Sequence, residues 1–266
     1  MPPSTLSVAI ITLNEEANLA RTLASVQFAD EIIIVDCGST DRTAEIAQSF
    51  RAKVFTEPWN GFAAQKNSAI DKCSSTWVLS IDADEELTPE LQTELRQLLH
   101  LESTARTAIE AYRIPRRNLF LNRPIRQGGF YPDAKLRLFR RNNPATSSPI
   151  RFSERAVHET IQYTGPIGRL HSDLIHHAYP TLETYIEHMN RYSTLGAQLL
   201  VAQGRRSRNP LAFCTNVFLI PVLTFLWNYV FRLGFLDGRE GFLLHLYHSV
   251  YVSWKYAKAW SLTRQP

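Results

Sequence analysis

Apolar runs and amphipathic stretches alternate along the first hundred residues. Short continuous apolar runs are typical of strands buried on both faces, and apolar residues at helical spacing predict the helices between them. The expected strands are Leu6–Ile11, Glu31–Val35, Lys53–Thr56 and Trp77–Ile81, and the expected helices are Ala17–Val26, Thr43–Phe50, Phe62–Cys73 and Pro89–Leu99. Strands that alternate with helices predict βαβ units and a parallel sheet.

Such a sheet locates a ligand site before any chemistry is considered. Ligands of open α/β sheets bind outside the carboxyl ends of the strands. The four segments expected there are Thr12–Glu16, Asp36–Asp41, Glu57–Asn60 and Asp82–Glu86, and three of them are rich in carboxylates.

The pattern changes twice further along the chain. Ala111–Arg116 and Lys135–Arg140 alternate like strands, which predicts a mixed sheet with long loops up to residue 180. After that the chain is expected to be helical over Thr181–Gln203, Leu211–Leu233 and Arg239–Trp260. We therefore expect an α/β domain at residues 1–180 and a C-terminal helical region at residues 181–266.

Composition and charge narrow the function only slightly. The formal net charge of +4 suits an anionic partner, but no aromatic-basic signature or zinc-finger spacing favours nucleic acid. The three cysteines form no disulfide framework, and the start, Met1–Thr5, lacks the basic region of a signal peptide. His171, His176 and His177 lack clear zinc-ligand spacing for a helix. We expect a protein on the cytoplasmic side of the membrane.

The acidic cluster after the fourth strand is the main candidate for chemistry. Asp82 and Asp84 flank a single alanine, and two such carboxylates can turn toward one Mg²⁺ or Mn²⁺ that also holds a nucleotide diphosphate. The alternative is a solvated loop that caps the next helix. Asp36, at a neighbouring strand end, favours the metal site, because a carboxylate there can accept hydrogen bonds from a nucleobase or ribose. No Gly-rich dinucleotide or P-loop motif is present.

Several motifs carry a family resemblance. Thr12–Glu16, Val35–Asp41 and Leu79–Glu85, in this order, resemble the inverting family 2 glycosyltransferases of GT-A fold. The later motifs are most like the branch with lipopolysaccharide-core β-glucosyltransferases, and they are Gly61–Asn67, Tyr131–Asp133, Lys135–Arg140, Val157–Glu159 and Gly234–Gly238.

The resemblance implies roles for individual residues. Asp84 would hold the divalent metal, Asp36 the uracil of a UDP-sugar, and Asp82 would lie near the ribose and diphosphate. Lys66 would reach the diphosphate, unless it is a surface lysine. The residues expected to bind the nucleotide sugar are Thr12, Asn14, Glu15, Asp36, Lys66 and Asp82.

Inversion also needs a base that takes the proton of the acceptor hydroxyl. Glu159 matches the region where the family carries this base, and Glu154 and Asp133 are its rivals. The alternative is that Glu159 only pairs with a basic residue such as Arg155.

The C-terminal apolar segment points to a membrane. Leu211–Leu233 exceeds the roughly 20 apolar residues that a bilayer span needs, but Pro221 is expected to kink it. Arg205, Arg206 and Arg208 precede it and favour an anionic leaflet. A helical hairpin on the inner leaflet, a buried core or oligomer helix, and a true span are the three alternatives. We favour the first, because a cytosolic donor would meet a lipid-linked acceptor there.

Together these features predict a metal-dependent, inverting transfer of a hexose, expected to be glucose. The donor would be a UDP-sugar, and the acceptor a hydroxyl of a membrane-associated glycan or lipid, as in lipopolysaccharide-core or cell-envelope synthesis. The alternative is a non-catalytic, membrane-associated module that binds sugar nucleotides or glycans. A nucleotidyltransferase is disfavoured, because Thr12–Glu16 is acidic where a Gly-rich basic loop would be needed.

Overall fold

The computed structural model describes residues 4–104, 109–141, 150–153, 160–205, 207 and 209–264. It divides into two compact units: the first is Met1–Arg116 with Asp133–His176, and the second is Arg117–Pro132 with His177–Pro266. The predicted division at residue 180 lies close to the start of the last segment. Arg117–Pro132 also belongs to the second unit.

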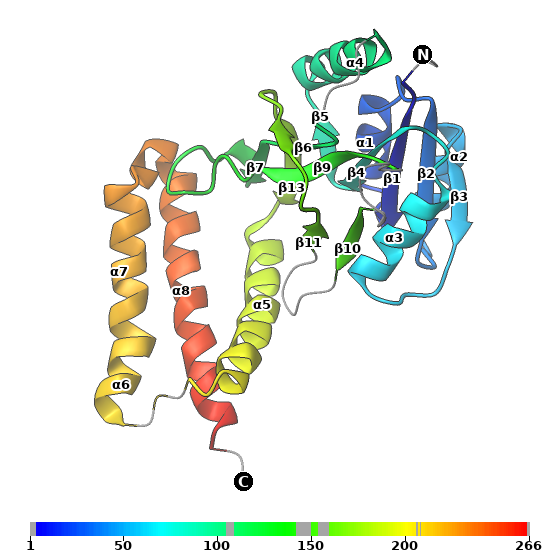
Figure 1. The fold of residues 1–266 in the computed structure, drawn as a ribbon. Helices are drawn as coiled ribbons and strands as arrows, with labels where there is room; N and C mark the ends of the chain where they lie inside the picture. Colours follow the sequence, from blue (N-terminus) through cyan, green and yellow to red (C-terminus); the bar gives the residue numbers. More distant parts are fainter. Residues whose placement is uncertain are drawn as a thin grey trace. The chain divides into compact units, whose positions relative to one another are not determined.

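A seven-stranded mixed sheet forms the centre of the first unit (Figure 1). The four predicted N-terminal strands are all present and run parallel to one another, whereas the strand Lys135–Arg140 is antiparallel to the strands on both sides of it. In spatial order the strands are β12 (Ile167–Arg169), β6 (Ala111–Ile114), β9 (Lys135–Arg140), β4 (Trp77–Asp82), β1 (Leu6–Thr12), β2 (Glu31–Asp36) and β3 (Lys53–Thr56).

Helices cover both faces of this sheet, because successive side chains of a strand point to opposite faces. Val8 and Ile10 of β1 pack in one cluster with α1 (Leu19–Ser25), α2 (Thr43–Ser49) and α4 (Pro89–Thr104). Ala9 packs in a second cluster with α3 (Phe62–Lys72). The continuous apolar runs of the sequence therefore reflect strands that are buried on both sides.

Several strands of the structure differ from the sequence prediction. The predicted strand Ala111–Arg116 stops at Ile114, because Pro115 has no N–H to donate. Around His176 the chain is extended in β13 (Leu174–Tyr179), not helical, and it pairs antiparallel with the unpredicted strand β5 (Glu85–Leu87). The other unpredicted strands in the described residues are β7 (Arg116–Phe120), β8 (Arg123–Pro124), β10 (Arg151–Ser153), β11 (Thr160–Gln162) and β12.

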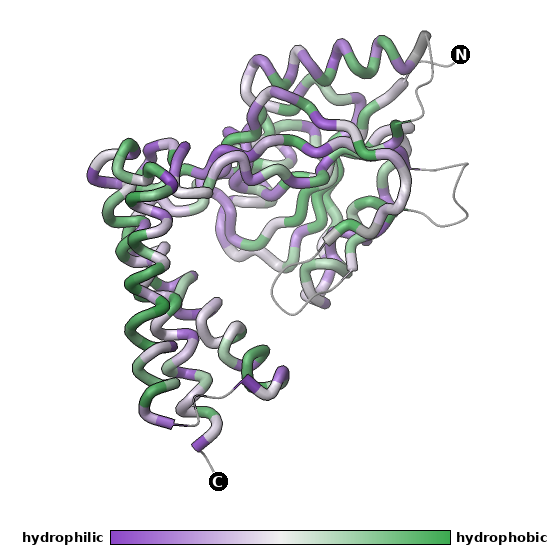
Figure 2. The backbone as a smooth tube through the Cα atoms, turned by 60° about the vertical axis from the view of Figure 1, so that its left-hand side comes forward, coloured by the Kyte–Doolittle hydropathy of each residue, from purple (hydrophilic) through white to green (hydrophobic). Residues whose placement is uncertain are grey.

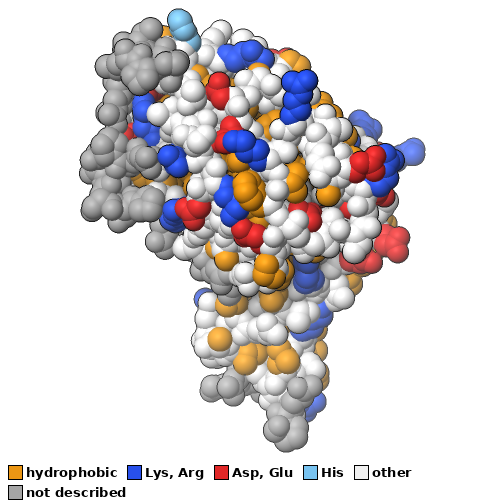
Figure 3. All heavy atoms as spheres, turned by 90° about the vertical axis from the view of Figure 1, so that its right-hand side faces the viewer, with side chains coloured by type: hydrophobic (Ala, Val, Ile, Leu, Met, Phe, Trp, Pro, Cys, Tyr) orange, Lys and Arg blue, Asp and Glu red, His pale blue; other side chains and the backbone are white. Residues whose placement is uncertain are grey.

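Charges of both signs are interspersed on the first unit. On the face drawn in Figure 3, the described basic and acidic side chains alternate instead of gathering into a patch of one sign. This distribution fits the small net charge of +4. Charge alone therefore does not mark a binding site on this face.

The second unit contains three long helical segments, as predicted: α5 (Leu182–Ala202), a continuous helix from Pro210 to Phe231, and α8 (Gly238–Leu262). The middle segment, here called the outer helix, consists of α6 (Pro210–Cys214), η1 (Thr215–Leu219), α7 (Ile220–Leu226) and η2 (Trp227–Phe231), where η1 and η2 are π-helical turns. α8 packs against both α5 and α7 (Figure 1).

The outer helix continues through Pro221, where the sequence suggested a kink. Proline cannot donate to the carbonyl four residues earlier, which here belongs to Val217. The Oγ of Ser253 on α8 donates to this carbonyl at 2.8 Å. A side chain of the neighbouring helix thus replaces the missing backbone hydrogen bond.

The motif Gly234–Gly238 fixes the loop after β8 within the second unit. The carboxylate of Asp237 accepts the backbone N–H groups of Arg126 and Gln127. Gly128, with a φ of +67°, lies so close to α8 that a Cβ atom would be 1.9 Å from Cε1 of His245. This packing explains why glycines occur in the loop.

Candidate active site

The strand register brings the predicted acidic segments to one edge of the sheet. β1 pairs with β2 so that Thr12 lies opposite Asp36, and it pairs with β4 so that Ile11 lies opposite Asp82. All three strands are parallel, so their carboxyl ends meet there. Asp36 and Asp82 thus end strands at the same edge of the sheet, but the expectation that these strands are neighbours is wrong, because β1 lies between β2 and β4.

The carboxylate of Asp36 is enclosed by hydrogen-bond donors. Its Oδ1 accepts the hydroxyls of Thr12 at 2.9 Å and Ser39 at 2.5 Å, and its Oδ2 accepts the backbone N–H groups of Gly38 and Ser39 at 3.0 and 2.8 Å. Burial raises the pKa of Asp36, but these hydrogen bonds lower it by a larger amount, so its net pKa shift is downward. Asp36 is therefore a carboxylate that also orders the loop after β2.

The loop after β1 is attached to the loop after β2. The backbone N–H of Asn14 donates to Oγ of Ser39 at 2.8 Å, and Oδ1 of Asn14 accepts the N–H of Thr40 at 2.9 Å. The backbone N–H of Glu15 donates to Oγ1 of Thr43 at 2.8 Å. These contacts hold the two loops as one polar rim beside Asp36.

Asp82 lies between two buried cations. Its Oδ1 is 2.7 Å from Nζ of Lys66, and its Oδ2 is 2.5 Å from Nη2 of Arg137. Burial raises the pKa of Asp82, but the charges of Arg137 and Lys66 hold it well below its usual range. Lys66 is 3% exposed and lies over the ring of Phe152, so it is not the surface lysine of the alternative interpretation.

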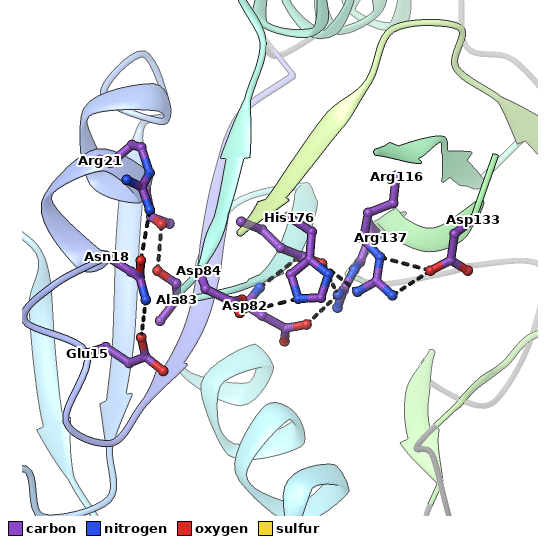
Figure 4. A network of polar contacts seen from close by, with 12 residues as sticks. Glu15, Asn18, Arg21, Asp82, Ala83, Asp84, Arg116, Asp133, Arg137 and His176 are labelled. Atoms are coloured by element: carbon purple, nitrogen blue, oxygen red, sulfur yellow. Dashed lines mark hydrogen bonds and ion pairs between the residues drawn. The ribbon is translucent and has the colours of Figure 1, made fainter. Parts of the chain in front are cut away.

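A chain of alternating charges continues from Arg137, and Figure 4 labels Asp82, Arg137, Arg116 and Asp133 of this chain. Nη2 of Arg137 also contacts Oε1 of Glu85 at 2.6 Å, and Nη1 of Arg116 contacts the same oxygen at 3.0 Å. Arg116 then binds Asp133 at 2.6 Å, and Lys135 binds Asp133 at 2.8 Å. Glu85, to which the sequence assigned no role, is fully buried and holds both arginines in place.

Asp84 points to a histidine on β13. Its Oδ2 lies 3.3 Å from Nε2 of His176, and the side chain of Asp84 is a quarter exposed. Burial raises the pKa of Asp84, but the hydrogen bond and charge of His176 lower it more. The pairing of β13 with β5 places His176 opposite Glu85, which is the residue that follows Asp84 in the sequence. A carboxylate oxygen and an imidazole nitrogen thus face each other at the edge of the sheet.

Glu15 lies on the other side of the two aspartates (Figure 4). Its Oε2 accepts Nδ2 of Asn18 at 3.0 Å. Burial raises its pKa, Asn18 lowers it, and the charges of Asp84, Asp41 and Asp82 raise it again, for a net increase. Several carboxylates therefore gather at this edge of the sheet, next to the cations Lys66 and Arg137.

The predicted catalytic base is Glu159. Glu159 and its rival Glu154 lie outside the described residues. The second rival, Asp133, belongs to the charge chain. Burial raises its pKa, but Arg116 and Lys135 lower it to about 2. A carboxylate held by two cations is a weak proton acceptor, so these contacts do not favour Asp133 as the catalytic base.

The sequence missed Arg116, Arg137 and His176. Arg137 could have been found from the alternation of Lys135–Arg140, which places it on one face of a strand with Lys135. His176 was missed because its segment was considered as a helix, in which the side-chain period differs from that of a strand.

Comparison with known proteins agrees with this geometry. Residues 7–161 match the family described as glycosyl transferase family 2. A lipopolysaccharide core biosynthesis glycosyltransferase of Rhizobium meliloti, LpsC, is 33% identical over 95% of this chain and 90% of its own length. An uncharacterised glycosyltransferase of Rickettsia typhi is 32% identical over 90% of this chain and 80% of its own length.

The fold is also that of a solved glycosyltransferase. A mannosyltransferase of Pyrobaculum calidifontis, solved with GDP-Man and Mn²⁺, aligns with a TM-score of 0.54 at 13% identity, over 100% of this chain and 90% of the other. The predicted α/β fold of GT-A type is thereby confirmed. The match over residues 7–161 and the 33% identity to LpsC show that this chain belongs to glycosyl transferase family 2.

Proposed function

We propose that this glycosyltransferase moves a hexose, glucose, from a UDP-sugar to a hydroxyl of a membrane-associated glycan or lipid, with inversion at the anomeric carbon. The pairing of Asp84 with His176 beside the enclosed carboxylate of Asp36 is the observation that carries the proposal. The likeness to LpsC supports a step in lipopolysaccharide-core or cell-envelope synthesis. The proposed place is the cytoplasmic side of the inner membrane, where the donor is soluble.

The residues around Asp84 fit a divalent metal. A carboxylate oxygen and an imidazole nitrogen, 3.3 Å apart, are both ligands that Mn²⁺ accepts. Within the described ranges no group of three His, Cys, Asp or Glu side chains could hold a metal together. Mg²⁺ and Mn²⁺ sites often use one or two protein ligands and complete the shell with waters and substrate phosphates. Asp84 and His176 would therefore hold the metal together with the donor diphosphate.

Asp82 fits a positioning role better than a metal ligand. Both of its oxygens already contact cations, Lys66 and Arg137. A diphosphate beside Asp84 would lie in the field of these two cations, and buried charges act strongly on one another. The metal, when bound, would stabilise the charge that develops on the departing UDP. Lys66 and Arg137 would add to this stabilisation from the protein side.

The nucleoside end of the donor would lie toward β1 and β2. Asp36 would accept the uracil N–H in place of one of its present donors, such as the hydroxyl of Ser39, and the rim of Thr12, Asn14 and Glu15 would border the nucleoside. Preorganised polar groups of this kind bind without large rearrangement. Glu159 would take the proton of the acceptor hydroxyl as it attacks the anomeric carbon.

The release of UDP tests this proposal. A panel of UDP-glucose, UDP-galactose, UDP-N-acetylglucosamine and GDP-mannose is supplied with Mn²⁺, Mg²⁺ or a chelator, and with a membrane glycolipid extract as acceptor. We expect release from a UDP-sugar with metal only. Asp84→Asn should lower the rate by roughly a hundredfold or more, because it removes a metal ligand. Glu159→Gln should lower it by roughly a hundred- to ten-thousandfold.

Glu90→Gln is the matched control, because it removes one carboxylate from an exposed position at the start of α4. It should keep the wild-type rate. Full release in the presence of chelator, or full activity of Asp84→Asn, would contradict the metal mechanism. Full activity of Glu159→Gln would leave the metal site intact and reject Glu159 as the base.

A further inference from the structure

The outer helix, Pro210–Phe231, has an inverted distribution of polarity. A helix on the surface of a water-soluble protein buries its apolar side chains. Here the exposed large side chains are all apolar, and they recur every three or four residues along the whole helix. They are Leu211, Phe218, Leu219, Val222, Leu223, Leu226, Trp227, Val230 and Phe231, with exposed fractions from 40 to 77%.

The side of this helix that faces α8 contains the polar group. Asn228 is 8% exposed. Beside it, Tyr229 contacts Phe242 and His245 of α8. An apolar outer face with a polar residue on the inside is the arrangement expected for a helix whose surroundings are less polar than water.

The residues that flank the outer helix carry positive charges, which suit the anionic headgroups of a lipid leaflet. No Asp, Glu, Lys or Arg occurs from Pro210 to Phe231, and only 6% of its most apolar stretch is buried. Figure 2 shows this segment in the hydrophobic colour along most of its length. Arg205 precedes it, and Arg232 and Arg239 follow it, all exposed. An apolar strip with arginines at its ends matches acyl chains beside anionic headgroups.

The opposite side of the same unit is polar. α5 exposes hydrophilic side chains along its length, among them Glu183, Glu187, Arg191 and Gln198. α5 is held firmly on α8, because Nζ of Lys258 bonds to four oxygens of Asn190, Ser193 and Thr194. The three helices of the second unit therefore form a layer with an apolar face on the outer helix and a hydrophilic face on α5.

The packing of α5 along α8 argues against an outer helix that spans the bilayer. Tyr185 and Met189 of α5 pack in one cluster with Leu244 of α8. Phe242 and His245, the neighbours of Leu244, contact Tyr229 of the outer helix. If the outer helix and α8 crossed a bilayer, the exposed Glu187 and Arg191, which lie further along α5, would enter the hydrocarbon, where charges are costly.

We propose that the outer helix binds a lipid bilayer side-on. Its axis lies in the plane of the interface, its apolar strip enters the acyl chains, and α5 stays in water. Interfacial helices of this kind bind through buried apolar area together with attraction to anionic lipids. The inference rests on the proposed function in one respect, since that function places the acceptor in the membrane.

Vesicles of phosphatidylethanolamine and phosphatidylglycerol test the binding. The full chain should float with the vesicles at low and at high salt, because apolar insertion is not screened. Phe218→Glu, which charges an exposed position of the strip, should lower the partition coefficient by roughly tenfold or more. Gln198→Glu adds the same charge to the exposed face of α5 and should leave binding within roughly twofold. A vesicle partition coefficient that is the same in Phe218→Glu as in the wild type would overturn the proposal.

The depth of insertion separates side-on binding from a span. A fluorophore is attached to a cysteine introduced at Leu211, Val222 or Phe231, in a chain with Cys37 and Cys214 replaced by serine. Quenching by lipids labelled at known depths should give similar depths at all three positions. A maximum at Val222, with both ends near the headgroups, would show a span and overturn side-on binding.

Two further readouts complete the test. Dimerisation in sedimentation experiments, abolished by Phe218→Glu and combined with no vesicle binding, would assign the strip to a second copy and overturn the proposal. UDP release with water as acceptor should be unchanged in Phe218→Glu. For the wild-type chain, metal-dependent UDP release without any vesicle binding would refute the side-on inference alone, and vesicle binding without metal-dependent UDP release would refute the proposed function alone.

Discussion

Asp84 and His176 come from different strands and from distant parts of the sequence, yet they face each other at 3.3 Å. Asp84 lies two residues after the end of β4, and His176 lies on β13. Asp84 contacts the imidazole of His176, whereas the two oxygens of Asp82 contact the cations Lys66 and Arg137. This difference is why we assign the metal to Asp84 and not to Asp82.

Replacing His176 tests this assignment at the level of one residue. His176→Asn should raise the Mn²⁺ concentration needed for half-maximal UDP release by roughly ten- to a hundredfold, because an imidazole ligand is lost. At saturating Mn²⁺ most of the rate should return. His177→Asn, which alters the next residue of the same strand on its opposite face, is the control and should leave the metal requirement unchanged. An unchanged requirement in His176→Asn would remove this residue from the metal site.

At the level of elements, Glu31 joins the start of β2 to three other segments. Its carboxylate accepts Oγ of Ser7 on β1 at 2.6 Å, Nζ of Lys53 on β3 at 2.7 Å and the backbone N–H of Ser74 at 2.8 Å. Burial raises the pKa of Glu31, but the hydrogen bonds from Lys53, Ser7 and Ser74 lower it to about 2. Glu31 lies at the edge of the sheet opposite to the site, so its contribution concerns stability.

The lowered pKa gives a pH-dependent prediction. Because the folded pKa is depressed, the stabilisation is complete above the unfolded value of about 4.5 and is lost as the pH falls through about 2. Glu31→Gln should lower the free energy of unfolding at neutral pH by about 2 kcal/mol. Near pH 3.5 the difference from the wild type should shrink to roughly half. Urea denaturation at both pH values measures it, and a difference that grows on acidification would contradict the assignment.

The elements of the N-terminal half could be predicted because their signals are local. Apolar runs such as Leu6–Ile11 and the helix signals between them depend only on neighbouring residues, and the structure has these elements within a few residues of the predicted bounds. The short strands β5 and β13 could not be predicted in the same way. They are stabilised by pairing between residues that are far apart in the sequence, such as Glu85 and His176.

The same distinction applies to the site. Asp36, Asp82 and Asp84 were found because strand ends can be read from the sequence. The contacts of Asp82 with Lys66 and Arg137 depend on how α3 and β9 lie against β4, and no local pattern contains that information. Glu159 was chosen from the family resemblance, and its role stays a prediction.

At the scale of the whole molecule, the sequence contains two chemically different parts. Residues 7–161 match the glycosyltransferase family, and they include every residue that we assign to the donor except His176. The C-terminal helices carry an apolar strip and a polar face. We infer that the first part handles a soluble nucleotide sugar and that the second brings the protein to an acceptor in the membrane.

The binding of UDP in the presence and absence of Mn²⁺ tests the central claim most directly. Calorimetry with the wild type should show binding of UDP with Mn²⁺ and a loss of affinity of roughly a hundredfold with chelator, because a metal held by Asp84 would supply positive charge to the diphosphate. Asp84→Asn should resemble the chelated wild type, and Glu90→Gln should resemble the wild type with metal. Equal UDP affinity of the wild type with Mn²⁺ and with chelator would contradict the account.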